Sequence, residues 1–305
     1  MSPESIKGNS LGIEATNSMF RVVVLSDDGN VTYQNEIPTN ANEQVVPQLA
    51  NLVSEVKRNN AIEVVGLAVS GLVSRRANRV ILSTQFPSLA ATDVAAELAN
   101  LTKTKVFLEN DANSAAFGEF KLGAGRGSNN MFYATIGIGI GGAIILDGKL
   151  WRGATGFAGE FGHIAINEDG EKLEDVASAA NISRRVKERL FRDNTSSLFR
   201  NDNEQILTIN NIVQAAKDGD DFAQLMLERT GAHIGTAIAS VINLLNVERI
   251  VIGGEVMEAG RVILTSVVRR AGERSFQPSF EATTIAAAEL GASAVAIGAA
   301  FLAKS

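Results

Sequence analysis

Residues 105–122 read KVFLENDANSAAFGEFKL, and the change of character inside this stretch decides how the chain is interpreted. The apolar run at its start predicts a strand over 105–109, and a helix is predicted from there to about residue 122. Asn110 and Asp111 stand at the junction. Both residue types are preferred helix N-caps, so capping is one interpretation of the pair. The other is chemical: a carboxylate in the first turn is held rigidly, stays ionised beside the helix dipole, and could accept a proton from a hydroxyl nucleophile.

The rest of the chain alternates between strands and helices on both sides of this junction. Upstream, apolar spacing predicts strands over 11–14, 20–25, 31–37 and 64–69 and helices over 43–59 and 90–101. Downstream, it predicts strands over 131–136, 143–146, 250–252 and 283–287 and helices over 173–192, 208–217, 222–245, 257–273 and 292–303. This alternation predicts an α/β fold with mixed sheets. The polar segment 194–203 is the best candidate for a mobile loop.

Composition excludes several functional classes. The chain has 305 residues, of which 45% are apolar and 20% charged, and this predicts two globular domains. The net charge is −6 and the basic residues are scattered, so no nucleic-acid partner is expected. Cysteine is absent and there are only two histidines, which excludes disulfides, cysteine zinc sites and multi-histidine metal centres. No apolar stretch is long enough for a membrane span or a signal peptide, so we expect a cytoplasmic protein without a membrane partner.

The glycine-rich segment 137–142, GIGIGG, matches the pattern G-x-G-x-x-G. In a dinucleotide fold that pattern runs from a strand into a helix, whereas the residues that follow here predict a second strand ending at Asp147-Gly148. An oxidoreductase would need the helix, so it is the weakest alternative. A glycine hairpin can still hold phosphate, because bare backbone lets N–H groups approach oxygen atoms closely. A tight turn with a bulge is the structural alternative.

Three further places carry residues suited to chemistry. The segment 159–163, GEFGH, places an acid and an imidazole three residues apart in a glycine-rich loop, and Glu174 begins a predicted helix. The segment 250–255, IVIGGE, ends a strand with two glycines, where a flat ligand could approach the backbone. Each place has a structural alternative: a loop pair, a first-turn acid and a simple turn.

In this order, the segments resemble the ROK family of sugar kinases and repressors, within the actin-like ATPase superfamily. The matching stretches cover nearly the whole chain: LENDANSAAFGEF (108–120), TIGIGIGGAIILDGKL (135–150), GATGFAGEFGHIAI (153–166), LEDVASA (173–179), INLLNVERIVIGGEV (242–256) and AELGASAVAIGAA (288–300). The resemblance implies two actin-like, ribonuclease H-like domains with a central cleft. We expect the first over 1–110 plus a C-terminal helix at about 292–305, and the second over 111–291.

The repressor branch of the family carries an additional N-terminal helix-turn-helix domain, for which this chain has no room, so we expect the kinase branch. The family is often dimeric, although the sequence identifies no interface for a homodimer.

The resemblance also implies a role for each candidate residue. Asp111 matches the catalytic base that accepts the proton of the sugar hydroxyl. The positions that match sugar-binding residues are Gly71, Asn110, Asp111, Glu160, His163 and Glu174. The positions that match the phosphate loops and adenosine site, and so imply the cofactors ATP and Mg²⁺, are Glu14, Thr16, Asn17, Ser18, Thr135, Gly137, Gly139, Gly253 and Gly254. Glu14 is the expected Mg²⁺ ligand. A base, Mg²⁺ and backbone N–H groups are what phosphoryl transfer requires.

The chain departs from the family pattern in three places. The interval 164–172, IAINEDGEK, has no cysteine where the family has a zinc motif, so we expect no zinc and a loop held by other means. Glycine follows Ser70 where proline is usual. The first phosphate loop, usually Asp-x-Gly-Gly-Thr-Lys, reads EATNSM over 14–19, so both glycines are lost and the acid is one methylene longer. If this loop holds phosphate, we expect Asn17 in the left-handed region and Ser18 donating its hydroxyl.

Two functions of different classes remain. The first is an ATP-dependent hexose kinase acting on glucose or a related sugar, which the retained Asp111 and the second phosphate loop favour. The second is a catalytically weak or inactive relative that senses a sugar, which the altered first loop favours. The sugar-binding positions are complete, as both hypotheses require. The sequence identifies neither the sugar nor the phosphate donor.

Overall fold

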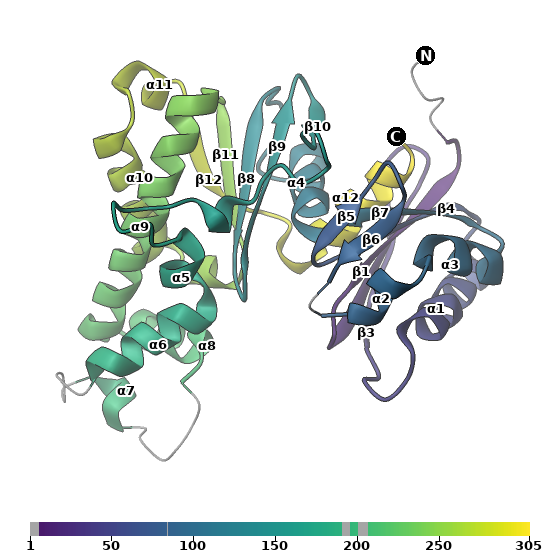
Figure 1. The fold of residues 1–305 in the computed structure, drawn as a ribbon, viewed down its shortest axis with the longest axis horizontal. Coiled ribbons are helices and arrows are strands. Elements are labelled where there is room, and N and C mark those ends of the chain that lie inside the picture. Colours follow the sequence, from purple (N-terminus) through teal and green to yellow (C-terminus); the bar gives the residue numbers. More distant parts are fainter. Residues whose placement is uncertain (1–5, 84, 191–195, 201–206) are drawn as a thin grey trace. The chain divides into compact units, whose positions relative to one another are not determined.

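The computed structural model describes the chain except for residues 1–5, 84, 191–195 and 201–206. Contacts between residues divide it into two compact units, each containing strands and helices (Figure 1). None of the described helices is both long and apolar enough to cross a membrane. Unit 1 comprises residues 1–127, 149–158 and 289–305, and unit 2 comprises residues 128–148 and 159–288.

Unit 1 is built on a sheet with the strand order β3-β2-β1-β4-β7. The first three strands form the predicted antiparallel meander, with Gly29 at φ +81° in the turn between β2 and β3. β4 runs parallel to both β1 and β7, so the carboxyl ends of these three strands meet at one edge, where α/β proteins place ligands. The strands are Asn9–Ala15 (β1), Met19–Leu25 (β2), Val31–Pro38 (β3), Ile62–Val69 (β4) and Lys105–Asn110 (β7).

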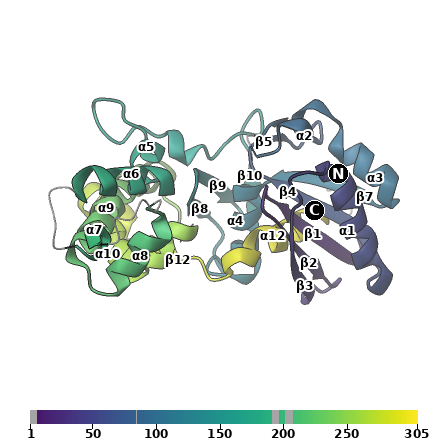
Figure 2. The same cartoon turned by 90° about the horizontal axis from the view of Figure 1, so that it is seen from below.

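The two faces of this sheet carry side chains of different size, because successive residues of a strand point to opposite faces. Leu11 and Ile13 belong to the core that includes α1 and α3, whereas Gly12 and Gly66 face α12. In Figures 1 and 2, α12 and α4 lie on the side of the sheet away from α1 and α3. These helices are Val45–Asn59 (α1), Val94–Thr102 (α3), Asp111–Leu122 (α4) and Ala294–Ala303 (α12).

α12 packs backbone to backbone on its neighbours. A Cβ at Gly12 would lie 1.8 Å from the carbonyl oxygen of Ala296, and a Cβ at Gly66 would lie 2.0 Å from another carbonyl oxygen of α12. α12 meets α4 just as closely, since a Cβ at Gly298 would lie 1.7 Å from the carbonyl oxygen of Ser114. α4, which the sequence assigns to the second domain, is therefore held in unit 1 by contacts that only glycine allows.

The connection between β4 and β7 is more broken than the sequence predicts. The single helix expected over 90–101 is two helices, because the Asp93 side chain accepts a hydrogen bond from the Ala96 N–H and starts a new helix. A short antiparallel hairpin that the sequence reading missed precedes them. The additional elements here are Leu72–Ser74 (β5), Arg79–Leu82 (β6) and Pro87–Ala91 (α2).

The second five-stranded sheet has the order β10-β9-β8-β11-β12, and all of its strands except β10 lie in unit 2. Counted along the chain, its strands follow the succession third, second, first, fourth and fifth, as in the first sheet. β8 and β9 are antiparallel, whereas β11 runs parallel to β8 and β12. The motif at 137–142 is thus strand, turn and strand, and the dinucleotide-binding arrangement does not occur there. The strands are Met131–Ile136 (β8), Ile140–Leu146 (β9), Lys149–Trp151 (β10), Arg249–Gly253 (β11) and Thr284–Ala287 (β12).

Helices cover this second sheet through a core that includes Phe132, Ala134 and Ile136 of β8. α9 is the long helix of this layer and packs along α10. The described α-helices of unit 2 are Leu173–Ala177 (α5), Ala179–Leu190 (α6), Ser197–Arg200 (α7), Ile209–Lys217 (α8), Asp221–Leu245 (α9), Arg261–Arg274 (α10) and Gln277–Glu281 (α11). Short 3₁₀ turns of the chain are Phe161–His163 (η1), Glu255–Ala259 (η2) and Gly291–Ser293 (η3).

Two predicted helices of unit 2 are interrupted. The helix expected over 173–192 breaks at Ser178, which is extended at φ −69° and ψ 154°, and the next N–H, that of Ala179, donates to the carbonyl of Gly137 at 2.8 Å. The helix expected over 257–273 is preceded by η2 and begins after Gly260, which has φ +61°.

The polar segment expected as a mobile loop, 194–203, contains α7. Its residues 194–195 and 201–203 lie outside the described part of the chain.

The glycine contacts of α12 predict a large loss of stability in Gly298→Ala. Alanine is normally better than glycine inside a helix by about 1 kcal/mol, but the new methyl group would collide with the α4 backbone. Overpacking of this kind typically costs about 1–3 kcal/mol, so we expect a lower urea midpoint by circular dichroism. Gly127→Ala is the control, because Gly127 has φ +80° and open space around it, and only backbone strain of about 1 kcal/mol is expected. Equal midpoints for Gly298→Ala and the parent would contradict the packing argument.

Candidate active site

The first part of the candidate site lies at the edge of unit 1 where β4 and β7 end. Asn110 is the N-cap of α4, since its Oδ1 accepts the N–H of Asn113 at 3.0 Å. Its Nδ2 donates to the Gly71 carbonyl and to Asp111 Oδ1, both at 2.9 Å. Gly71 has φ +120°, and a Cβ there would lie 2.1 Å from the Leu82 carbonyl oxygen. The structure therefore brings Gly71, Asn110 and Asp111 together, and it leaves capping to Asn110 rather than to Asp111.

Opposing effects act on the Asp111 carboxyl. Burial raises its pKa, whereas hydrogen bonds from the Ala112 N–H, the Ser70 side chain and the Asn110 amide lower it. Burial dominates, so the pKa of Asp111 lies above its ordinary value of 3.8. A raised pKa brings a carboxylate closer to the range in which a general base works best. Ser70 was not among the predicted site residues, although its position directly after β4 is the signal that could have found it.

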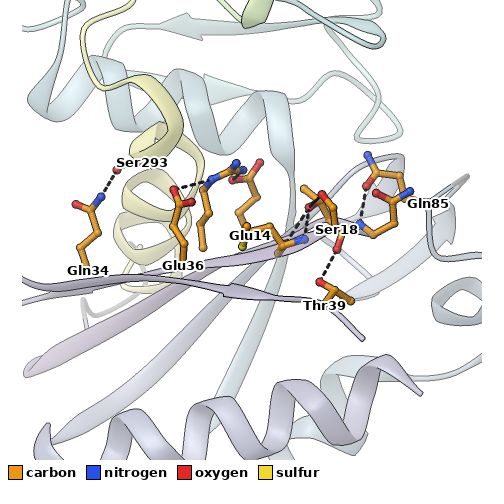
Figure 3. A network of polar contacts seen from close by, with 11 residues as sticks. Glu14, Ser18, Gln34, Glu36, Thr39, Gln85 and Ser293 are labelled. Atoms are coloured by element: carbon orange, nitrogen blue, oxygen red, sulfur yellow. Dashed lines mark hydrogen bonds and ion pairs between the residues drawn. The ribbon is translucent and has the colours of Figure 1, made fainter. Parts of the chain in front are cut away.

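The segment predicted to be the first phosphate loop is a closed turn between β1 and β2 (Figure 3). Thr16 Oγ1 accepts the N–H of Met19 at 3.0 Å and donates to the carbonyl of Met19 at 2.9 Å. The N–H of Thr16 donates to the same carbonyl at 3.0 Å. The N–H of Asn17 donates to Oε1 of Gln85 at 3.1 Å. Gln85 therefore occupies a backbone donor that the resemblance assigns to phosphate, and the sequence carried no signal for it.

The expected conformation of Asn17 is wrong. Among the described residues, positive φ at non-glycine positions occurs only at Asn78, Lys103, Asp147 and Asn246. Asn17 needs no left-handed conformation here, because the hydroxyl of Thr16 closes the turn and replaces the geometry that two glycines would supply. The hydroxyl of Ser18 lies 3.4 Å from that of Thr16.

Glu14, the predicted Mg²⁺ ligand, is paired with a cation. Its Oε2 accepts Nη1 of Arg21, the residue directly opposite on β2, at 3.0 Å, and Nε of Arg21 donates to Oε1 of Glu36 at 3.1 Å (Figure 3). Burial raises the pKa of Glu14, Arg21 opposes this, and nearby Asp111 raises the pKa further. Mg²⁺ in phosphoryl transfer is bound by one or two carboxylates and the substrate phosphates, so the Glu14 carboxylate fits that donor set.

In the turn 159–163 of unit 2, tightly packed residues alternate with residues whose polar side chains are exposed. A Cβ at Gly159 would lie 2.2 Å from the Gly142 carbonyl oxygen, and the buried ring of Phe161 packs edge-on against another core ring at 5.1 Å. Glu160 and His163 are exposed, and the N–H of His163 donates to the Glu160 carbonyl at 3.1 Å. Residues three apart on a 3₁₀ turn have aligned side chains. Glu160 and His163 are therefore presented side by side.

Glu174 lies beside this turn and beside the second phosphate loop. Its Oε2 accepts the N–H of Ile140 at 2.8 Å and would be 3.3 Å from a Cβ on Gly139 and 3.2 Å from one on Gly162. Larger residues at either glycine would press against this carboxylate. The turn that carries Glu160 and His163 thus lies next to Glu174, and one oxygen of Glu174 already holds the N–H of Ile140.

The remaining predicted nucleotide positions lie where β8 and β11 end. Gly253 pairs with Thr135, so the two strand ends meet. Gly254 has φ +93°, and a Cβ there would lie 2.3 Å from the Ile136 carbonyl oxygen. Gly254 is thus required by strand packing as well as by the predicted adenosine site. Gly137 differs, since a Cβ there would meet only Glu255, at an ordinary van der Waals distance of 3.8 Å.

The cysteine-free interval 164–172 is held as a small hairpin. Ala165 and Lys172 form an antiparallel bridge, and Asn167 makes two hydrogen bonds with Glu171. Its Oδ1 accepts the Glu171 N–H, and its Nδ2 donates to the Glu171 carboxylate, both at 3.0 Å. The described residues contain no group of three potential ligands that could hold a metal. The loop, which contains no cysteine, is therefore held by the hydrogen bonds of Asn167 and by the bridge between Ala165 and Lys172.

The strand order shared by the two units, with antiparallel strands followed by parallel ones, defines an α/β protein of the actin-like class. Residues 10–305 match the model of the ROK family, and the chain belongs to that family. It is 31% identical to a glucokinase of Thermotoga maritima over 307 residues, covering 96% of each chain.

Two solved structures have similar folds. A ROK family glucokinase from Streptomyces griseus, in complex with glucose and AMPPNP, has a TM-score of 0.83 at 26% identity and covers 97% of this chain and 99% of its own. A ROK family transcriptional regulator, a homologue of E. coli MLC protein, has a TM-score of 0.85 at 26% identity and covers 98% of this chain and 78% of its own. Both classes in the ROK family are thus represented among the similar structures.

The raised pKa of Asp111 predicts that Asp111→Asn changes stability in a pH-dependent way. Below about pH 3.8 the carboxyl is protonated in both states and folding costs nothing extra. As the pH rises through the elevated folded pKa, only the folded state resists ionisation, so the parent loses stability relative to the variant. We expect the gain of Asp111→Asn in urea unfolding to grow toward neutral pH, by about 1.4 kcal/mol for each unit of pKa elevation.

Asp27→Asn is the control for this measurement. Asp27 accepts the Gly8 N–H at 2.8 Å and pairs with Lys304, and both interactions lower its pKa. Its contribution is present above the unfolded pKa and lost as the pH falls, so its removal should show the opposite trend. A stability difference for Asp111→Asn that does not vary with pH would count against a raised pKa.

Proposed function

We propose that this protein is an ATP-dependent hexose kinase in which Asp111 is the general base. The observation that carries the proposal is the arrangement around Asp111: a carboxylate at the carboxyl edge of the unit 1 sheet, with burial raising its pKa and with Ser70 and Asn110 orienting it. Its position in the first turn of α4 fixes the carboxylate, and the 31% identity to a glucokinase supports the same assignment. Glucose or a closely related hexose is the proposed substrate.

In the proposed reaction Asp111 accepts the proton of the attacking sugar hydroxyl. The proposed sugar ligands are Gly71, Asn110, Glu160, His163 and Glu174. Hexoses present several hydroxyl groups, each of which both donates and accepts hydrogen bonds, and this mixture of carboxylates, amide, imidazole and backbone carbonyl can satisfy them. Bound Mg²⁺ would supply positive charge at the phosphates, with Glu14 as its protein ligand.

The nucleotide is proposed to bind at Thr135, Gly137, Gly139, Gly253 and Gly254. The backbone at Gly137 supports this, because it carries no side chain of its own and the nearest group that a Cβ there would meet, Glu255, lies 3.8 Å away. Thr16, Asn17 and Ser18 are proposed to face the transferred phosphoryl group. Cytoplasmic location follows from the same proposal, since ATP and free hexoses are cytoplasmic substrates.

The decisive experiment measures sugar-dependent ADP release from Mg-ATP across hexoses and N-acetylhexosamines. We expect turnover with glucose or a near relative, and Asp111→Asn should lower kcat by at least ~10²-fold while calorimetry still detects the sugar, because the base acts only in the transition state. Asp27→Asn, at an exposed carboxylate of unit 1, is the matched control and should keep the parent's kcat. Unchanged turnover per folded molecule in Asp111→Asn would leave this residue with a structural role only.

One observation favours the second candidate, a sugar sensor without efficient catalysis. The first loop is closed by its own hydrogen bonds, with the Asn17 N–H bound to Gln85 and Glu14 paired with Arg21. A phosphoryl group would have to replace these partners. We therefore expect the kinase to be slow rather than absent, and the sensor remains the alternative.

Loop variants separate the two candidates. Gln85→Ala frees the Asn17 N–H, and the double variant Thr16→Gly, Asn17→Gly restores bare backbone, so each should keep or raise kcat and lower the KM for ATP. Glu14→Ala should abolish turnover. Gln48→Ala is the control for Gln85→Ala, because the Gln48 amide also bonds to backbone groups but at the start of α1. Strong sugar binding with no turnover in the parent or in any loop variant would establish the sensor instead.

A further inference from the structure

A buried ion pair in unit 1 lies next to the Asn110–Asp111 turn and has no role in the chemistry described above. Glu109 is 3% exposed, and its Oε2 accepts both Nε and Nη2 of Arg152, at 3.0 and 2.6 Å. A guanidinium that donates two hydrogen bonds to one carboxylate is held in a fixed orientation. Arg152 directly follows β10, far from Glu109 in the sequence, so the pair joins two distant segments.

The other oxygen of Glu109 leads toward Asp111. Oε1 accepts Nδ2 of Asn113 at 3.0 Å and the N–H of Asn110 at 3.1 Å. Asn113 is 3% exposed, and its own N–H is the donor that Asn110 caps. Asn110 then donates to Asp111 Oδ1 at 2.9 Å. An unbroken series of hydrogen bonds therefore runs from the Arg152 guanidinium to the Asp111 carboxylate.

Arg152 also fixes the backbone of its own segment. Its carbonyl accepts the N–H of Ala158 at 3.1 Å, and Gly153 has φ +71°, so residues 152–158 form a closed loop. The next residues in the chain are Gly159 and Glu160. The ion pair thus joins the Asp111 turn to the loop formed by residues 152–158.

We propose that Arg152 is a positioning residue for Asp111, acting through Glu109, Asn110 and Asn113. The inference rests on the proposed function, because it assigns Arg152 a share in orienting the proposed base. A purely structural cross-link would require only that the two segments stay together. A positioning role requires in addition that the orientation of Asn110, and hence of the Asp111 carboxylate, depends on the two hydrogen bonds that the Arg152 guanidinium donates to Glu109.

The charges nearby make the variants feasible. The guanidinium of Arg75 is also close: burial lowers its pKa, and the Glu109 carboxylate opposes that effect. Glu109 therefore keeps a neighbouring cation when Arg152 is replaced by Met. The double variant Glu109→Gln, Arg152→Met removes both charges of this ion pair together, and such paired replacements are usually well tolerated. Arg152→Lys keeps the positive charge but lacks the planar guanidinium group that donates two hydrogen bonds to Glu109.

The test compares Arg152→Met, Arg152→Lys and the double variant with Arg184→Met, which breaks an exposed pair with Glu188. We expect Arg152→Met and the double variant to lower kcat by about 10- to 100-fold, since small misplacements of a catalytic group have effects of this size. Sugar affinity by calorimetry should weaken about fivefold, because Asn110 is also a proposed sugar ligand. Arg152→Lys should recover part of the loss, and Arg184→Met should match the parent.

The pH profile distinguishes positioning from a loss of folded protein. The hydrogen bond from Asn110 lowers the pKa of Asp111, so its loss should raise that pKa and move the acid limb of kcat/KM to higher pH. A merely structural role would reduce the amount of active protein and leave the limb in place. Unchanged kcat and an unchanged acid limb in folded Arg152→Met, or equal losses in Arg184→Met, would overturn the proposal.

The same variants remain informative if the parent shows no turnover. In that case the proposed kinase function has failed, and sugar affinity alone decides: a weakening of about fivefold in Arg152→Met but not in Arg184→Met supports the positioning role. Equal affinity in the two variants, or a parent that binds none of the sugars, overturns it.

Discussion

The contact on which most of unit 1 depends is the approach of α12 to β1, β4 and α4 without intervening side chains. Glycines at 12, 66 and 298 allow it, and any Cβ there would lie 1.7–2.0 Å from a carbonyl oxygen. Because close-packed backbones have no freedom to slide, α12 holds β1 and α4 in fixed positions relative to each other. The end of β1 carries Glu14, and the start of α4 carries Asp111. The geometry of the proposed base is thus a consequence of a helix that contributes no group to the reaction.

Carboxylates that accept backbone N–H groups hold many of the other segments of the chain together. Glu119, fully buried in α4, accepts the N–H groups of Glu289 and Leu290, which lie shortly before α12. Glu174 accepts the N–H of Ile140, and Glu109 accepts that of Asn110. Hydrogen bonds to an ionised acceptor are about twice as strong as neutral ones, and losing one leaves a buried charge unsatisfied. Acids in this chain therefore fix backbone segments, and their presence near the site does not by itself indicate chemistry.

The sequence predicted the parts of the molecule that local pattern controls. Apolar runs predicted the strands of both five-stranded sheets except the short β10, and the strand predicted after Gly142 correctly excluded a dinucleotide fold. The helix breaks at Asp93 and Ser178 were missed because each depends on a hydrogen bond that periodicity does not reveal. Gln85 and Arg152 were missed for a related reason. Their partners, Asn17 and Glu109, lie tens of residues away, and only the fold brings them together.

The departures in the first loop form one consistent arrangement rather than separate losses. Without glycines, the turn 16–18 needs an internal closure, which the Thr16 hydroxyl provides through two hydrogen bonds to Met19. The Asn17 N–H then needs an acceptor when no phosphate is present, and Gln85 supplies it. The longer side chain of Glu14 reaches the guanidinium of Arg21, so the carboxylate is paired as well. Every polar group of this loop named here has a protein partner in the absence of nucleotide. In the proposed reaction the nucleotide would therefore have to compete with these contacts, which is the reason that slow turnover is expected.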